Sequence, residues 1–343
     1  MAPRLTWPVA AVAALVVLLA AACGGSGVDP GAASAGPGTS GTTHSAPAAG
    51  ASSGPVTPPS TSSPATTLPA TPRATTPVSS ELPRGGRTLF PHYRLVGFAG
   101  HPNSVPLGRL GIGKLADRTA EIEKLAERYA DGRTPLPVLE LIATVVQAQP
   151  GRDGMYRARA SDSMIATQLA AARQVNGILL LGIQPGRSPF LTEVKAYAKW
   201  LKEPDVGIAL DPEWAMGPRQ VPMRVFGSTT GKEINGIAAY LAGVVKENDL
   251  PEKVLVFHQL APSIVRHESD IKAHPGVAII KSVDGIGSRA MKEETWRKLT
   301  ATMPKSLYPG FKLFYEEDAQ FGPLMTPAQV LALRPEPDYV LYE

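Results

Sequence analysis

The feature that most constrains this fold is a regular alternation of short apolar runs with longer segments of helical periodicity. Eight such runs occur after residue 88, and most are continuous stretches of Val, Ile, Leu and Phe. Such runs are typical of parallel strands buried on both faces, and their starts are spaced as in βα units. The expected strands are 93–99, 137–142, 177–183, 206–210, 254–258, 277–280, 311–315 and 339–342, and the expected helices are 117–129, 161–175, 190–202, 232–247, 261–273, 291–302 and 326–333.

Eight strands in about 255 residues match a closed (β/α)8 barrel of the TIM type in both number and length. We therefore predict a barrel domain over residues 88–343, with the eighth helix missing or replaced by the segment before residue 93. An open, doubly wound sheet is the alternative. Such a sheet is favoured by a Gly-rich phosphate loop after the first strand, and the sequence GFAGHP at 97–102 is not one.

Residues 1–22 have the composition of an export signal peptide. Arg4 gives the positive start, 9–19 the apolar centre, and three alanines at 20–22 the small residues before a processing point. The single cysteine of the chain, Cys23, follows directly. This arrangement resembles the bacterial lipobox, although Ala20 stands where that motif prefers Leu. The resemblance implies a diacylglyceryl group on Cys23 and a lipoprotein anchored to the outer face of the cell membrane; an ordinary secretory signal is the alternative.

Residues 23–87 separate this signal from the predicted barrel. From 24 to 86, 53 of the 63 residues are Gly, Ala, Ser, Thr or Pro, and none is aromatic. Such a composition cannot bury enough apolar surface to offset the entropy of ordering. The sequence therefore predicts a disordered linker that holds the barrel away from the membrane.

Polar side chains follow the apolar runs where the expected strands end, which is the end that carries the active site in these barrels. The eighth strand offers only Tyr342 and Glu343, and no comparable polar set interrupts the strand starts. We therefore expect a polar, ligand-binding mouth. The residues expected to line it are His101, Glu140, Gln184, Arg187, Asp211, Glu213, Trp214, His258, Asp284, Lys312, Tyr315 and Glu316.

The sequence ALDPEW at 209–214 places two carboxyl groups two residues apart at the end of the fourth strand. Side chains alternate along a strand, so Asp211 and Glu213 are expected on the same side. Glu213 would be a general acid/base, Asp211 the neighbour that tunes its pKa, and Trp214 an apolar wall. Glu316, on the parity of Lys312 in the seventh strand, would be the second carboxylate that a glycosidase needs.

These motifs resemble known families. The sequence GIALDPEW at 207–214 is similar to the strand-4 segment of chitinase-type glycosidases, with Asp211 and Glu213 at its last two acidic positions; Ala209 and Pro212 depart from that pattern. The pair of carboxylates on strands 4 and 7 resembles the retaining barrel glycosidases, without their Asn-Glu dipeptide. Most of residues 93–343 resembles a group of uncharacterised lipoproteins and secreted proteins of high-GC Gram-positive bacteria, through stretches such as IQPGR at 183–187 and GFKLFYE at 310–316. That group implies no particular reaction.

Several other functions remain as alternatives. The carboxylates of Asp211 and Glu213 could be structural, as turn cap and ion-pair partner. The histidines at 101 and 258 could join acidic side chains around a metal ion, but no HxH or HExxH spacing supports that, and Lys312 could form a Schiff base. The barrel could also bind a glycan or other polar ligand without catalysis, which the aromatic content of 6% favours, or be a purely structural envelope protein.

The chain lacks the composition of several other classes of protein. A net charge of +4 is no signature of a nucleic-acid binder, and no G-x-S-x-G motif follows a strand as a serine hydrolase requires. A single cysteine excludes an internal disulfide framework. The expected protein is a monomer without cofactor or metal. It would be glycoside-hydrolase-like and act on a cell-envelope or short glycan.

Overall fold

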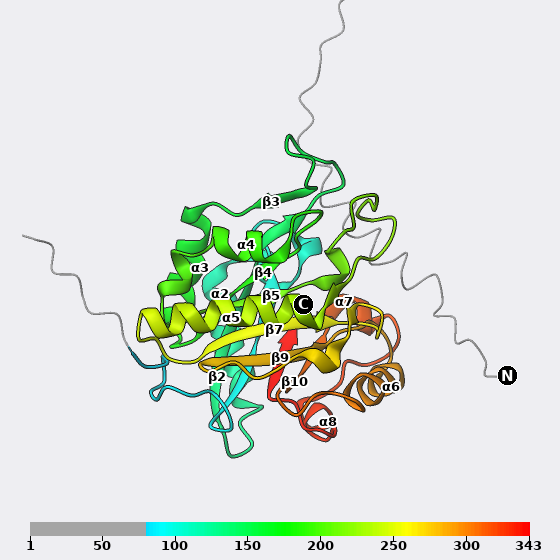
Figure 1. The fold of residues 1–343 in the computed structure, drawn as a ribbon. Coiled ribbons are helices and arrows are strands. Elements are labelled where there is room, and N and C mark those ends of the chain that lie inside the picture. Colours follow the sequence, from blue (N-terminus) through cyan, green and yellow to red (C-terminus); the bar gives the residue numbers. More distant parts are fainter. Residues whose placement is uncertain (1–79) are drawn as a thin grey trace, which may run out of the picture. The chain divides into compact units, whose positions relative to one another are not determined.

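A closed barrel of eight parallel strands forms the centre of the molecule (Figure 1). The structure is a computed structural model that describes residues 80–343, so the predicted signal peptide, Cys23 and most of the predicted linker lie outside the described residues. β1 pairs with β2 on one side and with β11 on the other, which closes the sheet and confirms the TIM-type barrel. The barrel strands are β1 (Tyr93–Gly100), β2 (Thr134–Val146), β4 (Ile178–Ile183), β5 (Val206–Leu210), β7 (Lys253–Gln259), β9 (Val277–Val283), β10 (Tyr308–Leu313) and β11 (Tyr339–Tyr342).

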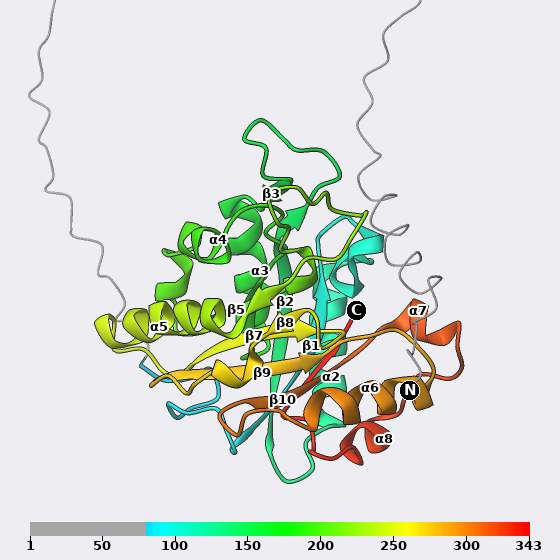
Figure 2. The same ribbon diagram turned by 45° about the vertical axis from the view of Figure 1, so that its right-hand side comes forward.

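Helices surround this sheet, as Figures 1 and 2 show from two directions. No helix in residues 80–343 is both long and apolar enough to cross a membrane. The α-helices are α2 (Leu115–Glu127), α3 (Asp162–Gln174), α4 (Phe190–Ala196), α5 (Gly231–Glu247), α6 (Arg289–Thr300), α7 (Tyr315–Ala319) and α8 (Pro327–Leu331). Short 3-10 turns are η1 (Val105–Leu107), η2 (Arg109–Gly111), η3 (Trp200–Lys202), η4 (Pro212–Trp214) and η5 (Glu268–Asp270). The short strands outside the barrel are β3 (Arg157–Arg159), β6 (Thr229–Thr230) and β8 (Val265–Arg266).

The helix predicted at 261–273 is wrong. The described residues between β7 and β9 contain no α-helix; β8 pairs with β6 there, and η5 follows. His267 has a left-handed backbone, which a regular helix excludes. The apolar residues that suggested a helix, Ile264, Val265 and Ile271, are buried from this irregular segment instead. Similarly, the helix predicted at 190–202 is divided into α4 and η3.

Alternation along the strands separates two apolar layers. Side chains such as Val138, Leu180 and Val256 fill the barrel, whereas Leu139, Leu181 and Phe257 pack outward against the helices. On β4, β5, β7 and β9 the apolar inward residues come first, and polar residues follow them on the same parity: Gln184, Asp211, His258 and Asp284.

The segment before β1 closes the amino-terminal end of the barrel. Leu82 and Leu89 are buried in the same apolar cluster as the barrel interior. Arg87 donates hydrogen bonds to the Leu250 carbonyl and the Asp249 carboxylate in the turn before β7. Folded structure therefore extends upstream of residue 88, into the last residues of the predicted linker.

Candidate functional site

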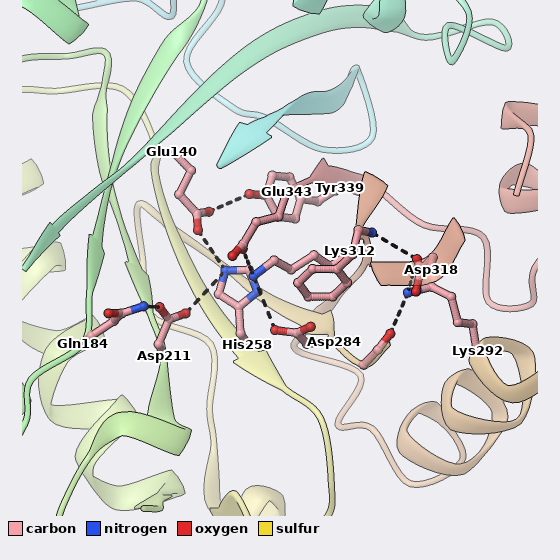
Figure 3. A network of polar contacts seen from close by, with 12 residues as sticks. Glu140, Gln184, Asp211, His258, Asp284, Lys292, Lys312, Asp318, Tyr339 and Glu343 are labelled. Atoms are coloured by element: carbon pink, nitrogen blue, oxygen red, sulfur yellow. Dashed lines mark hydrogen bonds and ion pairs between the residues drawn. The ribbon is translucent and has the colours of Figure 1, made fainter. Parts of the chain in front are cut away.

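Inward-facing polar side chains meet at the carboxyl ends of the barrel strands (Figure 3). We call them the strand-end cluster. Most members follow apolar inward residues on their own strand, as His258 follows Val254 and Val256 on β7, whereas Tyr339 belongs to the start of β11; the cluster therefore lies directly above the apolar interior. Its five carboxyl groups outnumber its two cationic side chains. The members are Glu140, Gln184, Asp211, Glu213, His258, Asp284, Lys312, Tyr339 and Glu343.

Glu140 of β2 and His258 of β7 form a buried pair across the barrel. His258 Nε2 lies 3.0 Å from Glu140 Oε1, and the Tyr339 hydroxyl donates to Glu140 Oε2 over 2.7 Å. Burial alone would raise the pKa of Glu140, but the His258 charge and the hydrogen bonds hold that pKa below its usual value. Burial likewise opposes the charge of His258, but Glu140 raises the histidine pKa above its usual value. Each member of the pair therefore favours the charged form of the other.

Asp211 directly follows β5 and lies beside this pair. Its Oδ2 accepts a hydrogen bond from Gln184 Nε2 over 3.1 Å, and its Oδ1 lies 4.0 Å from His258 Nε2. Gln184 is fixed in turn, because its Oε1 accepts from the Val146 backbone N–H. Burial raises the pKa of Asp211 to about 6 despite the attraction of His258 and Lys312. This carboxyl group thus changes its protonation state just below neutral pH.

Glu213 lies two residues further on, in η4, with 5% of its surface exposed. Its Oε2 has no hydrogen-bond partner in the part of the chain that the structure describes. Burial, together with the charges of Asp211 and Asp284, raises its pKa well above the usual value. Glu213 is therefore a buried carboxyl group whose surroundings favour the protonated form.

Lys312 of β10 balances part of the acidity. Its Nζ lies 2.6 Å from Glu343 Oε2 and 3.4 Å from Asp284 Oδ2. Burial would lower the pKa of Lys312, but these carboxylates hold it well above the usual value. An amine kept protonated in this way is a poor nucleophile, which argues against a Schiff base.

A second buried ion pair braces the loops beside the cluster. Lys292 Nζ lies 2.9 Å from Asp318 Oδ2 and donates to the Gly285 carbonyl. Asp318 also accepts from the backbone N–H groups of Gly287 and Phe314. The pair joins α6 and α7 to the loop that carries Asp284, and it therefore supports the position of that carboxylate.

The structure does not bring Glu316 or Tyr315 to the cluster. The predicted strand 311–315 ends at Leu313, and Tyr315 begins α7. A helix has a different periodicity from a strand, so the parity argument fails beyond this point. Glu316 is exposed, and it is not positioned as the second carboxylate. Tyr315 stacks on Tyr342 outside the barrel, with ring centroids 5.1 Å apart.

Three other predicted residues lie near the mouth in different roles. Trp214 is buried in an apolar cluster with Val146 and Met216, so its faces are not available for stacking on a sugar. The Arg187 side chain stacks on Tyr156 and donates to the Gln220 carbonyl, which links two loops. His101 is half-buried, and its Nδ1 lies 3.0 Å from the Ile142 carbonyl oxygen.

Sequence reasoning missed Tyr339 and, as a site residue, Glu343. Tyr339 stands in a short apolar run at the chain's last strand, where a tyrosine is read as an ordinary core residue. Strand alternation could have identified it, because Tyr339 and Leu341 face the same, inward side of β11. Tyr339 also lies opposite Gly310 of β10. A Cβ on Gly310 would lie 3.0 Å from the Tyr339 ring, so the glycine makes room for that ring inside the barrel.

Within residues 80–343, no group of three or more His, Cys, Asp or Glu side chains is arranged to hold a metal ion. The cluster places together two carboxyl groups with raised pKa values: that of Asp211 is raised to about 6, and that of Glu213 is raised well above its usual value.

No protein-family model matches the sequence, and no curated protein matches it. Among solved structures, a spore coat polysaccharide biosynthesis protein from Bacillus subtilis matches with 15% identity and a TM-score of 0.36, over 73% of this chain and 59% of its own. A hyperthermophilic endo-β-1,4-glucanase matches with 8% identity and a TM-score of 0.32, over 64% of this chain and 80% of its own. A GH18 chitinase from Pseudoalteromonas aurantia has 8% identity and a TM-score of 0.33, over 73% and 93%. The chain is thus distantly similar in structure to glycoside hydrolases, and the similarity concerns the fold alone.

Proposed function

We propose that the protein is a glycoside-hydrolase-like enzyme whose general acid is Glu213. One observation carries the proposal: the Glu213 carboxyl group is buried, has an oxygen without a partner among residues 80–343, and has a pKa raised well above its usual value. A protonated carboxyl group in a buried site is the form that donates a proton to a departing oxygen. A purely structural carboxyl group would be expected to have both oxygens satisfied.

The reaction would begin with transfer of the Glu213 proton to the glycosidic oxygen while the bond from that oxygen to the sugar carbon breaks. The positive charge that develops on the sugar is opposed by the Asp211 carboxylate and by the excess of carboxyl groups in the cluster. Water then adds hydroxide to the sugar carbon, and its remaining proton returns to the Glu213 carboxylate. Gln184 keeps Asp211 in place through its hydrogen bond.

The substrate we propose is a cell-envelope or short soluble glycan. The signal-like segment and Cys23 support a lipid-anchored barrel at the outer face of the membrane, where such glycans occur. The burial of Trp214 removes the predicted stacking platform. A long glycan cleft therefore has less support than a site that accepts a chain end or a short fragment.

The test is to incubate the full-length protein with purified cell-envelope glycans and to follow released fragments by mass spectrometry. Glu213→Gln removes the acid while keeping the shape of the side chain. Glu316→Gln is the matched control, because it makes the same chemical change at an exposed carboxylate on α7. We expect release by the wild type and by Glu316→Gln, and none by Glu213→Gln. Equal release by all three proteins would contradict the assignment of the acid.

A second candidate is a non-catalytic binding barrel. It is favoured by the ion pairs that already neutralise Glu140 and Lys312, and by the burial of Trp214. In that case the glycans would raise the melting temperature of the wild type and of Glu213→Gln equally, because ligand binding stabilises the folded state. No fragment would be released by either protein.

A further inference from the structure

A groove of about 380 Å³ lies outside the barrel, between the connection that follows β1 and the start of α3. We call it the α2–α3 groove. Asn103 comes directly after the carboxyl end of β1, so the groove opens on the same side of the barrel as the strand-end cluster. Its polar lining comes from Asn103, Ser161, Ser163, Thr167 and Gln168.

Gln168 is the unusual member of this lining. It lies on the buried face of α3, only 2% of its surface is exposed, and its Oε1 has no hydrogen-bond partner among residues 80–343. A buried amide oxygen without a partner destabilises the folded protein. A ligand in the groove that donates a hydrogen bond to Gln168 would offset this destabilisation.

The rest of the polar lining offers the complementary groups. Thr167 Oγ1 donates to the Ser163 carbonyl, which leaves its oxygen free to accept. Ser161 is the N-cap of α3, and its Oγ accepts from the Met164 backbone N–H. Helix α2 also begins here at Leu115, without a side-chain cap in the described structure, so the Leu115 N–H can donate, whereas the Asp117 N–H already donates to the Lys114 carbonyl. The ligand must therefore both donate and accept hydrogen bonds.

No charged side chain of the described residues lines this groove, and apolar groups from Pro102, Leu110 and Met164 complete it. Hydroxyl groups both donate and accept without carrying charge, and sugar C–H faces suit an apolar wall. We propose that the α2–α3 groove binds a neutral carbohydrate. The inference shares only the class of ligand with the proposed function, and it does not require catalysis by the strand-end cluster.

A second cavity provides a contrast. It measures about 420 Å³, lies where the predicted helix 261–273 is replaced, and also contains a buried glutamine with an unpartnered oxygen, Gln259. Its lining is charged, however, with Lys281, Glu268 and Lys298. Gln259 is therefore the matched control for Gln168: the same side chain, equally buried, in a lining that does not suit a neutral ligand.

The test is isothermal titration calorimetry on the full chain carrying Glu213→Gln, which prevents hydrolysis of the probe. The probes are cellotetraose, chitotetraose and maltotetraose, and the fully deacetylated, cationic form of chitotetraose. We expect at least one neutral tetrasaccharide to bind and the cationic form to bind more weakly. Gln168→Leu should weaken binding about three- to tenfold, as loss of one hydrogen bond predicts. Ser163→Trp, which fills the groove, should abolish that binding event.

Gln259→Leu should bind as the parent protein does. Gln168→Leu should not lower the melting temperature, because it removes an unpaired polar atom from a buried position. Binding that is equal in the parent, Gln168→Leu and Ser163→Trp would place the sugar elsewhere and overturn the inference, as would a failure of all three neutral probes to bind. If the wild type releases no glycan fragments, or Glu213→Gln releases as much as the wild type, while these binding results hold, only the proposed function is refuted.

Discussion

The buried Asp211 carboxylate should destabilise the protein at neutral pH, and Asp211→Asn should therefore stabilise it. The structure gives the magnitude, because burial raises the Asp211 pKa from 3.8 to about 6. That difference corresponds to about 3 kcal/mol in the free energy of unfolding once the group is ionised. Asparagine removes this cost, and its side-chain oxygen can still accept the hydrogen bond from Gln184.

The sign of the pH dependence follows from proton binding. The folded protein holds the Asp211 proton more tightly than the unfolded chain, so wild-type stability falls as the pH rises from 3.8 to about 6. The advantage of Asp211→Asn should therefore be about 3 kcal/mol at pH 8, about half of that at pH 5, and close to zero below pH 4.

Urea unfolding of the full chain at pH 5 and pH 8 measures this effect directly. Glu316→Gln is the control, since neutralising that exposed carboxylate should change the free energy of unfolding by less than about 0.5 kcal/mol. An Asp211→Asn protein no more stable than the wild type at pH 8, or one whose advantage is the same at both pH values, would refute the reasoning.

Three further substitutions test the surroundings of the site by urea unfolding. Glu140→Gln should lower the free energy of unfolding by about 3–5 kcal/mol, because it leaves buried His258 without its counter-charge. The pKa of Glu140 is lowered and that of His258 is raised, so this loss should be greatest between pH 4.5 and 6.5. A loss that does not change with pH would contradict the pairing. Trp214→Ala truncates a core side chain and should lower the free energy of unfolding by about 3–5 kcal/mol; a loss below about 1 kcal/mol would contradict the burial of Trp214. Gly310→Ala should cost about 1–3 kcal/mol, because its methyl group would crowd Tyr339, and unchanged stability would show that the ring has room to move.

The barrel could be predicted because its signal is repeated eight times. Each strand is a continuous apolar run, and continuous runs are required where both faces of a parallel strand are buried. The helix expected at 261–273 failed for the opposite reason: the apolar spacing of Ile264, Val265 and Ile271 fits either a helix or an irregular buried segment. Tertiary contacts decided between them, because Glu268 of η5 pairs with Lys281 of β9 there.

The candidate site could be predicted only as far as strand parity extends. Glu140, Asp211, His258 and Lys312 lie together because each follows apolar inward positions on its own strand. Strand alternation gave the wrong position for Glu316, because β10 ends before this residue and Glu316 lies in the helical turn of α7. Where a strand ends within a polar stretch depends on long-range contacts, which a single sequence does not contain.

The strand-end cluster combines two kinds of buried charge, and the difference bears on function. Glu140 and His258 stabilise each other through the contact at His258 Nε2, although His258 Nδ1 has no partner among residues 80–343. Asp211 and Glu213 instead have raised pKa values, and an oxygen of Glu213 has no partner in residues 80–343. Buried carboxyl groups with raised pKa values reduce stability when they ionise, and such groups are typical of functional sites, where stability is given up for chemistry or binding. The carboxyl groups after β5 are therefore the ones on which the proposed function depends.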